Sequence, residues 1–144
     1  KVLVVTNQPG AAKGKMSLAR IGHINQYIVN LASKNGAKID QVYCCPHHPK
    51  GSLGGDMSLI KKCKCRKPGT GLLLAGIDEH KIDGNMSYMV GDSISDIQAG
   101  KAIGLTTVLV GGLKCDARRI YEENNCLPDS VFQSLALFVQ SLKS

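Results

Sequence analysis

Apolar residues in this chain form short β-branched runs that alternate with segments of helical spacing. Residues 2–6 are one such run and predict a buried strand. After Ser17, a favourable residue at a helix start, apolar side chains recur at every third or fourth position as far as Asn35-Gly36, a common helix exit. Those side chains are Leu18, Ile21, Ile24, Ile28 and Leu31. The chain therefore begins with a strand and a helix.

The same alternation continues along the rest of the chain and predicts an α/β fold. We expect strands at residues 39–44, 86–90 and 105–110, and helices at residues 68–79, 95–102, 116–124 and 132–142. Pro68 suits the first turn of its helix. The buried side of that helix would take Leu72, Leu73, Ala75 and Ile77. Repeated strand and helix units favour a mostly parallel sheet flanked by helices.

Residues 45–65 break this alternation and form a loop that is longer than most loops in compact domains, so something must hold it. A Cys-x-His pair opens the loop and a Cys-x-Cys pair closes it, and each pair can aim two side chains at one tetrahedral zinc ion. The expected zinc ligands are Cys45, His47, Cys63 and Cys65. Cys44 and His48 offer the same spacing one residue away, and free thiols or a disulfide are the alternative to a metal. Four protein ligands leave no open position, so the zinc would be structural.

Composition and charge narrow the range of partners. Residues 1–144 suit a single domain, and no apolar run approaches the length of a membrane span. Lys and Arg number 18 against 11 Asp and Glu, and the resulting net charge of +7 favours an anionic partner. With no Trp, two Phe and four Tyr, few rings are present to stack on bases, so a basic zinc module for nucleic acid, suggested by residues 61–67, is the weaker alternative. We expect neither nucleic acid nor a membrane as the partner.

The six cysteines follow no segment that resembles a signal peptide. Free or metal-bound thiols are typical of a reducing compartment. We therefore expect a cytoplasmic protein. Cys115 and Cys126 have no assigned role.

Two polar stretches could hold phosphate. Thr6, Asn7 and Gln8 follow the first strand, at the end of a parallel sheet where α/β proteins place ligands, and their hydroxyl and amide groups can bind phosphate oxygens. Arg66 and Lys67 follow the last expected zinc ligand, which would fix the direction of both cations. A polar turn and a solvated basic edge are the plainer interpretations of these two stretches.

Two acidic residues lie where a strand passes into a helix. Asp92 comes just after the strand expected at residues 86–90, and Asp96 lies at the start of the next helix. Both carboxylates can therefore face one crevice. Asp92 would offer a hard oxygen ligand to Mg²⁺, with Asp96 behind it. A helix cap is the alternative role for Asp96.

In order and spacing, these stretches resemble the haloacid dehalogenase superfamily of phosphohydrolases. Thr6 and Asn7 are similar to its second motif, Lys67 to its third, and Asp92 with Asp96 to its fourth. The loop of Cys-x-His and Cys-x-Cys resembles the branch that holds heptose bisphosphate phosphatases and histidinol-phosphate phosphatases. The segment that begins at Thr6 looks more like the heptose enzymes.

The resemblance implies a Rossmann-like sheet without a large cap domain. It implies Mg²⁺-dependent hydrolysis of a small sugar phosphate, D-glycero-D-manno-heptose 1,7-bisphosphate, through a phosphoaspartyl intermediate, together with a structural zinc ion. Thr6 and Asn7 would then bind phosphate, Arg66 would contact the substrate phosphate, Lys67 would stabilise the phosphoryl charge and Asp92 would bind Mg²⁺.

The first motif of the superfamily, Asp-x-Asp on a strand ahead of the second motif, has no counterpart in the sequence. Its two acids carry out covalent attack and proton transfer, which cations cannot replace. We therefore expect residues 1–144 to be inactive alone, as a piece of a phosphatase whose nucleophile lies upstream of Lys1 on a central strand. Loss of that strand would open two backbone edges. The alternatives are an inactive sugar-phosphate-binding relic and a histidinol-phosphate phosphatase.

Overall fold

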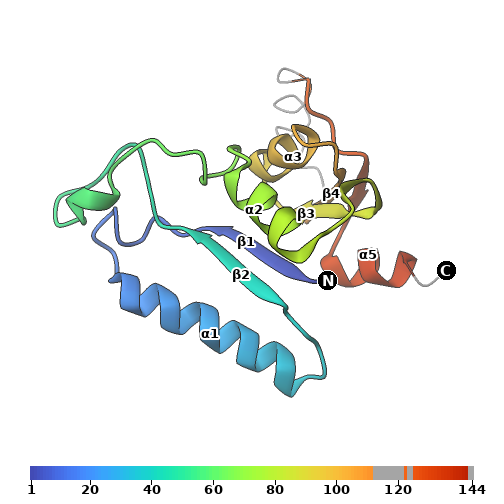
Figure 1. Cartoon of the computed structure of the whole chain (residues 1–144), viewed down its shortest axis with the longest axis horizontal. Helices are drawn as coiled ribbons and strands as arrows, with labels where there is room; N and C mark the ends of the chain where they lie inside the picture. Colours follow the sequence, from blue (N-terminus) through green and yellow to red (C-terminus); the bar gives the residue numbers. More distant parts are fainter. Residues whose placement is uncertain (112–121, 123–124, 143–144) are drawn as a thin grey trace. The chain divides into compact units, whose positions relative to one another are not determined.

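The computed structural model describes residues 1–111, 122 and 125–142, and its elements confirm an α/β fold. The described strands pair in parallel, and helices flank them (Figure 1). The chain divides into two compact units, residues 1–80 and residues 81–144. No helix in the part of the chain that the structure describes is long and apolar enough to cross a membrane.

Two parallel strands form the sheet of the first unit. β1 (Leu3–Asn7) lies beside β2 (Gln41–Cys45), and the two pair from their first residues to their last (Figure 1). α1 (Leu18–Lys34) connects them, because parallel neighbours need a crossover connection. The second strand lies slightly later than the pattern predicts, and Cys45 is therefore its last residue rather than the first residue of the loop.

α1 has the bounds that its terminal residues predict. The Ser17 hydroxyl accepts a hydrogen bond from the backbone of the first turn at 3.1 Å, and Asn35 caps the other end. Ile21 is buried, whereas Ile28 and Leu31 remain exposed. The capping residues therefore predict where this helix begins and ends, whereas its apolar spacing does not predict which of its side chains are buried.

α2 (Gly71–His80) begins later than the sequence predicts. Pro68 lies in the preceding turn, because the first N–H of α2 donates to the carbonyl of Lys64 at 2.9 Å and closes a loop there instead of a helical turn. The predicted buried side is wrong at Ala75, which is exposed, whereas Gly76 is buried. A Cβ at Gly76 would come within 2.9 Å of a leucine side chain of β1, so this glycine allows α2 to approach the sheet.

The described part of the second unit carries three parallel strands, β3 (Tyr88–Gly91), β4 (Thr106–Val110) and β5 (Ser130–Phe132), which lie in that order in one sheet. Its core joins the helix that follows β3 to the central strand, with Ile97, Leu109 and Cys126 in contact. A single 3₁₀ turn, η2 (Gly84–Met86), precedes the first strand. The described helices of this unit are α3 (Ile94–Lys101), which follows β3, and α5 (Leu135–Ser141), which follows β5.

β5 is an element that the hydrophobic pattern misses. The pattern assigns Phe132 to the last helix, but Phe132 ends β5, and α5 begins at Leu135. Three residues are too few for an alternation to be recognised, and pairing with β4 makes this segment a strand. Phe132 still packs against Phe138, with ring centroids 5.5 Å apart. The helix expected at residues 116–124 lies outside the described residues apart from its residue 122.

Asp129 ties the loop before β5 to β4. Its carboxylate accepts hydrogen bonds from the backbone N–H and the hydroxyl of Thr107, at 2.7 and 2.6 Å, and pairs with Lys101 at 2.9 Å. The Thr107 hydroxyl leads the interactions that lower the pKa of Asp129 from 3.8 to about 2, followed by Lys101. Thr107 is fully buried, so its polar groups depend on this carboxylate.

Replacing Asp129 by Ala should lower the free energy of unfolding by about 1–3 kcal/mol, because it leaves polar groups of buried Thr107 without their acceptor. Folding lowers the pKa of Asp129, so its stabilisation is present above about pH 4 and is lost as the pH falls towards 2. Urea unfolding at pH 7 and at pH 3 measures both effects. Lys101→Ala is the matched control, since it removes only a half-exposed ion pair and should cost less than about 1 kcal/mol. An equal loss in both variants would contradict the role of Thr107.

Candidate functional site

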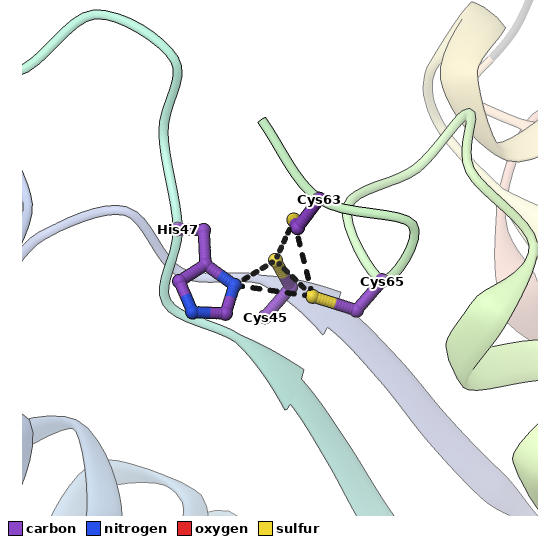
Figure 2. A group of neighbouring side chains, drawn as sticks. All are labelled: Cys45, His47, Cys63 and Cys65. Atoms are coloured by element: carbon purple, nitrogen blue, oxygen red, sulfur yellow. Dashed lines mark hydrogen bonds between the residues drawn. The ribbon is translucent and has the colours of Figure 1, made fainter. Parts of the chain in front are cut away.

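Four side chains from the two ends of the long loop meet at one point. Cys45 ends β2, His47 follows it, and Cys63 and Cys65 return from the far end of the loop (Figure 2). The Sγ atom of Cys65 lies 3.0 Å from that of Cys45, 3.2 Å from that of Cys63 and 3.2 Å from Nδ1 of His47. The four ligand atoms all lie within 4.8 Å of one another.

Two of the separations among these atoms match a tetrahedral zinc ion, and those between Cys65 Sγ and the other two sulfurs are shorter. Zinc bonds of about 2.3 Å to sulfur place neighbouring sulfur ligands about 3.8 Å apart. The Sγ atoms of Cys45 and Cys63 lie 3.6 Å apart, and Sγ of Cys45 lies 3.8 Å from Nδ1 of His47. Three thiols and an imidazole are also a donor set that zinc prefers. The residues present therefore fit the metal that the sequence predicts.

The neighbouring candidates Cys44 and His48 lie elsewhere. Cys44 packs against a small apolar cluster made of Ala11, Ala12, Ile21 and Leu59. Nδ1 of His48 accepts a hydrogen bond from the N–H of Lys50 at 3.1 Å, and the backbone of His48 forms a bridge with Ile60. The described cysteines are free, with no disulfide among the residues that the structure describes. Alternation along β2 separates the two cysteines, because adjacent strand residues point to opposite faces.

The electrostatics of the cluster also suit a cation. Burial and the neighbouring Cys45 and Cys63 thiols raise the pKa of Cys65 to about 12, and burial raises the pKa of Cys45. Burial opposes ionisation of Cys63, but hydrogen bonds from Cys65 and from the Arg66 backbone outweigh it and lower the pKa of Cys63. Burial also lowers the pKa of His47, with Lys61 adding to the effect. Because each thiolate opposes the next, a bound cation is needed to balance three of them.

The segment after Cys65 is fastened to the end of β1. The Asn7 side chain accepts a hydrogen bond from the N–H of Lys67 at 3.0 Å and donates to the carbonyl of Lys67 at 3.1 Å. The ammonium group of Lys67 donates to the carbonyl of Val5, and Arg66 Nη1 donates to the carbonyl of His47 at 3.2 Å. The structure thus brings Asn7, Arg66 and Lys67 beside the cysteine cluster.

Thr6 and Gln8 flank Asn7 at the carboxyl end of the strand pair. Thr6 lies opposite Cys44 in the register, and the N–H of Gln8 donates to the carbonyl of Cys45 at 2.8 Å, which extends the ladder beyond β1. Both residues are half-buried. The polar segment that the sequence singled out is therefore a continuation of the sheet and not a free turn.

A hollow of about 570 Å³ opens beside this end of the first unit. It lies between the segment after β1 and the tip of the long loop, and the N–H of Asp56 holds the two together by donating to the carbonyl of Ala11 at 3.0 Å. A short 3₁₀ helix, η1 (Met57–Leu59), follows in the loop. The lining includes one cationic side chain, that of Lys15.

Asp92 and Asp96 belong to the second unit. Asp92 directly follows β3 and is exposed, whereas Asp96 is only 4% exposed. The Asp96 carboxylate accepts hydrogen bonds from the backbone N–H and the hydroxyl of Ser93, at 3.1 and 2.8 Å. It therefore caps α3, the alternative role that the sequence left open, and it holds the turn that carries Asp92.

Sequence reasoning missed the contacts that connect these groups. The pattern marked Asn7 and Lys67 separately, but no local signal shows that an amide on β1 binds the peptide of a residue sixty positions later. The contact of Arg66 with the carbonyl of His47 is equally non-local. An Asn at the end of a buried strand, next to a loop without regular structure, was the available signal.

Parallel strands that end in polar turns, with a Gly-Asp turn ahead of a capped helix, are features of phosphohydrolases of the haloacid dehalogenase type. The HAD-hydrolase-like family model matches residues 64–137, and the chain belongs to that family. The resemblance inferred from the motifs is thereby confirmed.

Among curated relatives, D-glycero-beta-D-manno-heptose-1,7-bisphosphate 7-phosphatase of Escherichia coli (strain K12) is 37% identical over 143 residues, which are 99% of this chain and 71% of that protein. The enzyme of the same name from Yersinia pestis is 35% identical over 99% of this chain and 73% of its own length. Among solved structures, D,D-heptose 1,7-bisphosphate phosphatase from B. bronchiseptica, complexed with magnesium and phosphate, matches with a TM-score of 0.78 and 27% identity. That match covers 98% of this chain and 73% of the other.

Gly91→Ala should destabilise the second unit by about 1–3 kcal/mol, the usual cost of overpacking. A Cβ at Gly91 would overlap the Asp96 carboxyl group, so the cap of α3 would have to move. Urea unfolding measures the loss.

Gly84→Ala is the matched control in the same unit, because a Cβ there would meet only a leucine methyl at 3.6 Å, an ordinary contact. We expect that variant to be as stable as the original chain or slightly more stable. Equal stability of Gly91→Ala and Gly84→Ala would refute the close packing of Asp96.

Proposed function

We propose that this protein acts as a Mg²⁺-dependent phosphatase on D-glycero-D-manno-heptose 1,7-bisphosphate, a small sugar phosphate. The observation that carries the proposal is the attachment of Lys67 to the end of β1 through Asn7, and of Arg66 to the carbonyl of His47, beside the four candidate metal ligands. The 37% identity to the E. coli heptose bisphosphate phosphatase supports the choice of substrate. A cytoplasmic location is part of the same proposal.

The groups at the end of β1 would bind and polarise the phosphate. Phosphoryl transfer depends mainly on positioning and on stabilisation of negative charge at the phosphoryl oxygens. The Lys67 ammonium group, which donates to the Val5 carbonyl, would transfer that hydrogen bond to a phosphoryl oxygen. Arg66 would contact a phosphate of the substrate, and Thr6 and Gln8 would donate from the strand end.

Asp92 would be a magnesium ligand. Its exposed carboxylate stands on a turn that Asp96 holds rigid, and carboxylate oxygens are ligands that Mg²⁺ prefers. The related B. bronchiseptica enzyme was solved with magnesium and phosphate, which supports this role. Mg²⁺ at this position would supply charge neutralisation for the phosphoryl group.

The proposed reaction also needs a nucleophilic carboxylate. Asp-x-Asp, the first motif of the superfamily, does not occur in residues 1–144. The proposal therefore requires a motif-one strand in addition to these residues, and β1 has an edge on which no strand pairs among the residues that the structure describes. Without that strand, the groups described above can bind a sugar phosphate but cannot form the phosphoaspartyl intermediate.

The test compares residues 1–144 alone with the same chain joined, ahead of Lys1, to a strand segment ending in Asp-x-Asp. We expect inorganic phosphate release from the heptose bisphosphate in the presence of Mg²⁺ only from the joined chain, because only that chain holds a nucleophile. The matched control carries Asn-x-Asn in place of Asp-x-Asp and should be inactive.

Histidinol phosphate serves as the alternative substrate in the same assay. Faster turnover of histidinol phosphate would replace the heptose assignment with the amino-alcohol phosphate. Calorimetric binding of the heptose bisphosphate without phosphate release from the joined chain would instead favour a sugar-phosphate-binding relic.

We propose that Cys45, His47, Cys63 and Cys65 hold one structural zinc ion. Their ligand atoms already lie at distances that suit a tetrahedral site, and four protein ligands leave no position for a reacting water. The zinc would hold the two ends of the loop together and would thereby fix the start of the Arg66-Lys67 segment.

Elemental analysis of the purified chain should find about one zinc per molecule, and a chelator should lower the thermal midpoint, because metal binding contributes to folding. Cys65→Ser should lose most of the zinc. Cys44→Ser is the matched control and should keep it, since Cys44 packs into the apolar cluster instead. Zinc loss from Cys44→Ser with retention in Cys65→Ser would reverse the ligand assignment.

A further inference from the structure

We infer that Asn7 is a positioning residue, whose side chain holds the peptide of Lys67 and so aims the Lys67 ammonium group at the phosphate. The inference rests on the proposed phosphatase function and deepens it. It assigns the contribution of the Asn7 side chain to its contact with Lys67 and not to a direct bond with phosphate.

The geometry uses both polar atoms of the amide. Oδ1 of Asn7 accepts from the N–H of Lys67 at 3.0 Å, and Nδ2 donates to the carbonyl of the same residue at 3.1 Å. Only a carboxamide can supply a donor and an acceptor on one short planar group, because a carboxylate only accepts. The Asn7 side chain thus accepts from and donates to the backbone of one residue, as the backbone of a neighbouring β-strand would.

Asn7 is itself held firmly enough to serve as an anchor. It lies opposite Cys45 in the β1–β2 register, and the next residue, Gln8, donates its N–H to the carbonyl of Cys45. Cys45 is also a member of the metal cluster. Cys45, the last residue of β2, therefore lies beside two groups that hold the Lys67 segment. It is opposite Asn7 in the register, and its sulfur lies next to that of Cys65.

The far side of the segment is closed by a turn. The N–H of Gly69 donates to the carbonyl of Arg66 at 2.7 Å, and that of Gly71 donates to the carbonyl of Lys64 at 2.9 Å. These bonds shape the turn but attach it to nothing outside itself. The bonds from Asn7 attach the Lys67 peptide to the end of β1, and they help to fix the point from which the long Lys67 side chain extends.

Turning the amide towards a phosphate would break these bonds, and only the second N–H of Nδ2 could reach another group without doing so. Breaking them would cost the half-buried Lys67 peptide two hydrogen bonds, which is unfavourable. Displacement of a charged group by about 1 Å can cost roughly 100-fold in rate. Loss of the Asn7 side chain should therefore reduce kcat through Lys67, with little effect on KM.

The first test needs no catalysis. Amide hydrogen exchange, followed by NMR on the zinc-loaded chain of residues 1–144, reports on the N–H of Lys67. Asn7→Ala should speed its exchange by roughly 10-fold, about the effect of one hydrogen bond. Asn7→Asp keeps an acceptor and should leave the exchange within about 3-fold of the original.

Asn35→Ala is the matched control for this measurement. It also removes one amide that binds a backbone carbonyl, at the end of α1, and should leave exchange at Lys67 unchanged. If Lys67 exchanges equally fast with and without the Asn7 side chain, the inference is wrong, whether or not the chain proves to be a phosphatase.

The second test is a double-mutant cycle in the joined chain that carries Asp-x-Asp. Asn7→Ala should lower kcat by about 10- to 100-fold with KM within about 3-fold, whereas the same change in a Lys67→Ala background should alter kcat/KM by less than about 3-fold. If Asn7 bound phosphate directly, Asn7→Ala would lower kcat/KM by the same factor with and without the Lys67 side chain. That result would overturn the inference.

Zinc content and circular dichroism verify that each variant is folded. If Asn7→Ala loses its zinc or its helical signal, Asn7→Asp takes its place in the cycle. That variant loses the bond to the Lys67 carbonyl, so a smaller kcat loss that disappears in the Lys67→Ala background is expected. An inactive joined chain would count against the proposed function, while the exchange measurement would still decide the role of Asn7.

Discussion

The parallel pairing of β1 with β2 is the interaction on which the candidate groups of the first unit depend. The register sets Asn7 opposite Cys45, so the last residue of each strand carries a functional group. Asn7 binds the Lys67 peptide and Cys45 joins the metal cluster, and both therefore act on the same short segment, residues 65–67. A shift of one residue in either strand would turn that strand's side chain to the other face of the sheet. Strand register thus controls the chemistry at this end of the molecule.

The cluster of Cys45, His47, Cys63 and Cys65 can hold the two ends of the long loop together. Residues between His47 and Cys63 contain only one short 3₁₀ helix, and the entropy lost on ordering such a loop must be offset. Three thiols and an imidazole that converge on one point can offset it through metal bonds. Arg66 and Lys67 directly follow Cys65 in the chain, so the position of the cluster determines where these two cations begin. The candidate metal ligands and the candidate phosphate-binding cations are then parts of one local arrangement.

In the second unit, the close approach of the Asp96 carboxyl group to Gly91 holds the turn that carries Asp92. Gly91 has no side chain, which leaves room for the Asp96 carboxyl group, and Asp96 binds the backbone and the hydroxyl of Ser93. The intervening Asp92 is left exposed at the end of β3, on a turn whose two ends are both fixed. Asp96 thus stabilises the turn, and the proposed magnesium ligand Asp92 stays exposed on it.

Local patterns determined the strand and helix order, the caps of α1 and the Cys-x-His and Cys-x-Cys pairs, because these depend on neighbours a few residues apart. Alternation alone could not choose between Cys44 and Cys45. Tertiary structure decided that Cys45 faces the cluster, that three residues around Val131 form β5, and that α2 begins only at Gly71. It also decided that Asn7 binds Lys67. Each of these outcomes depends on a partner distant in the sequence, and hydrophobic periodicity contains no information about which distant groups will meet.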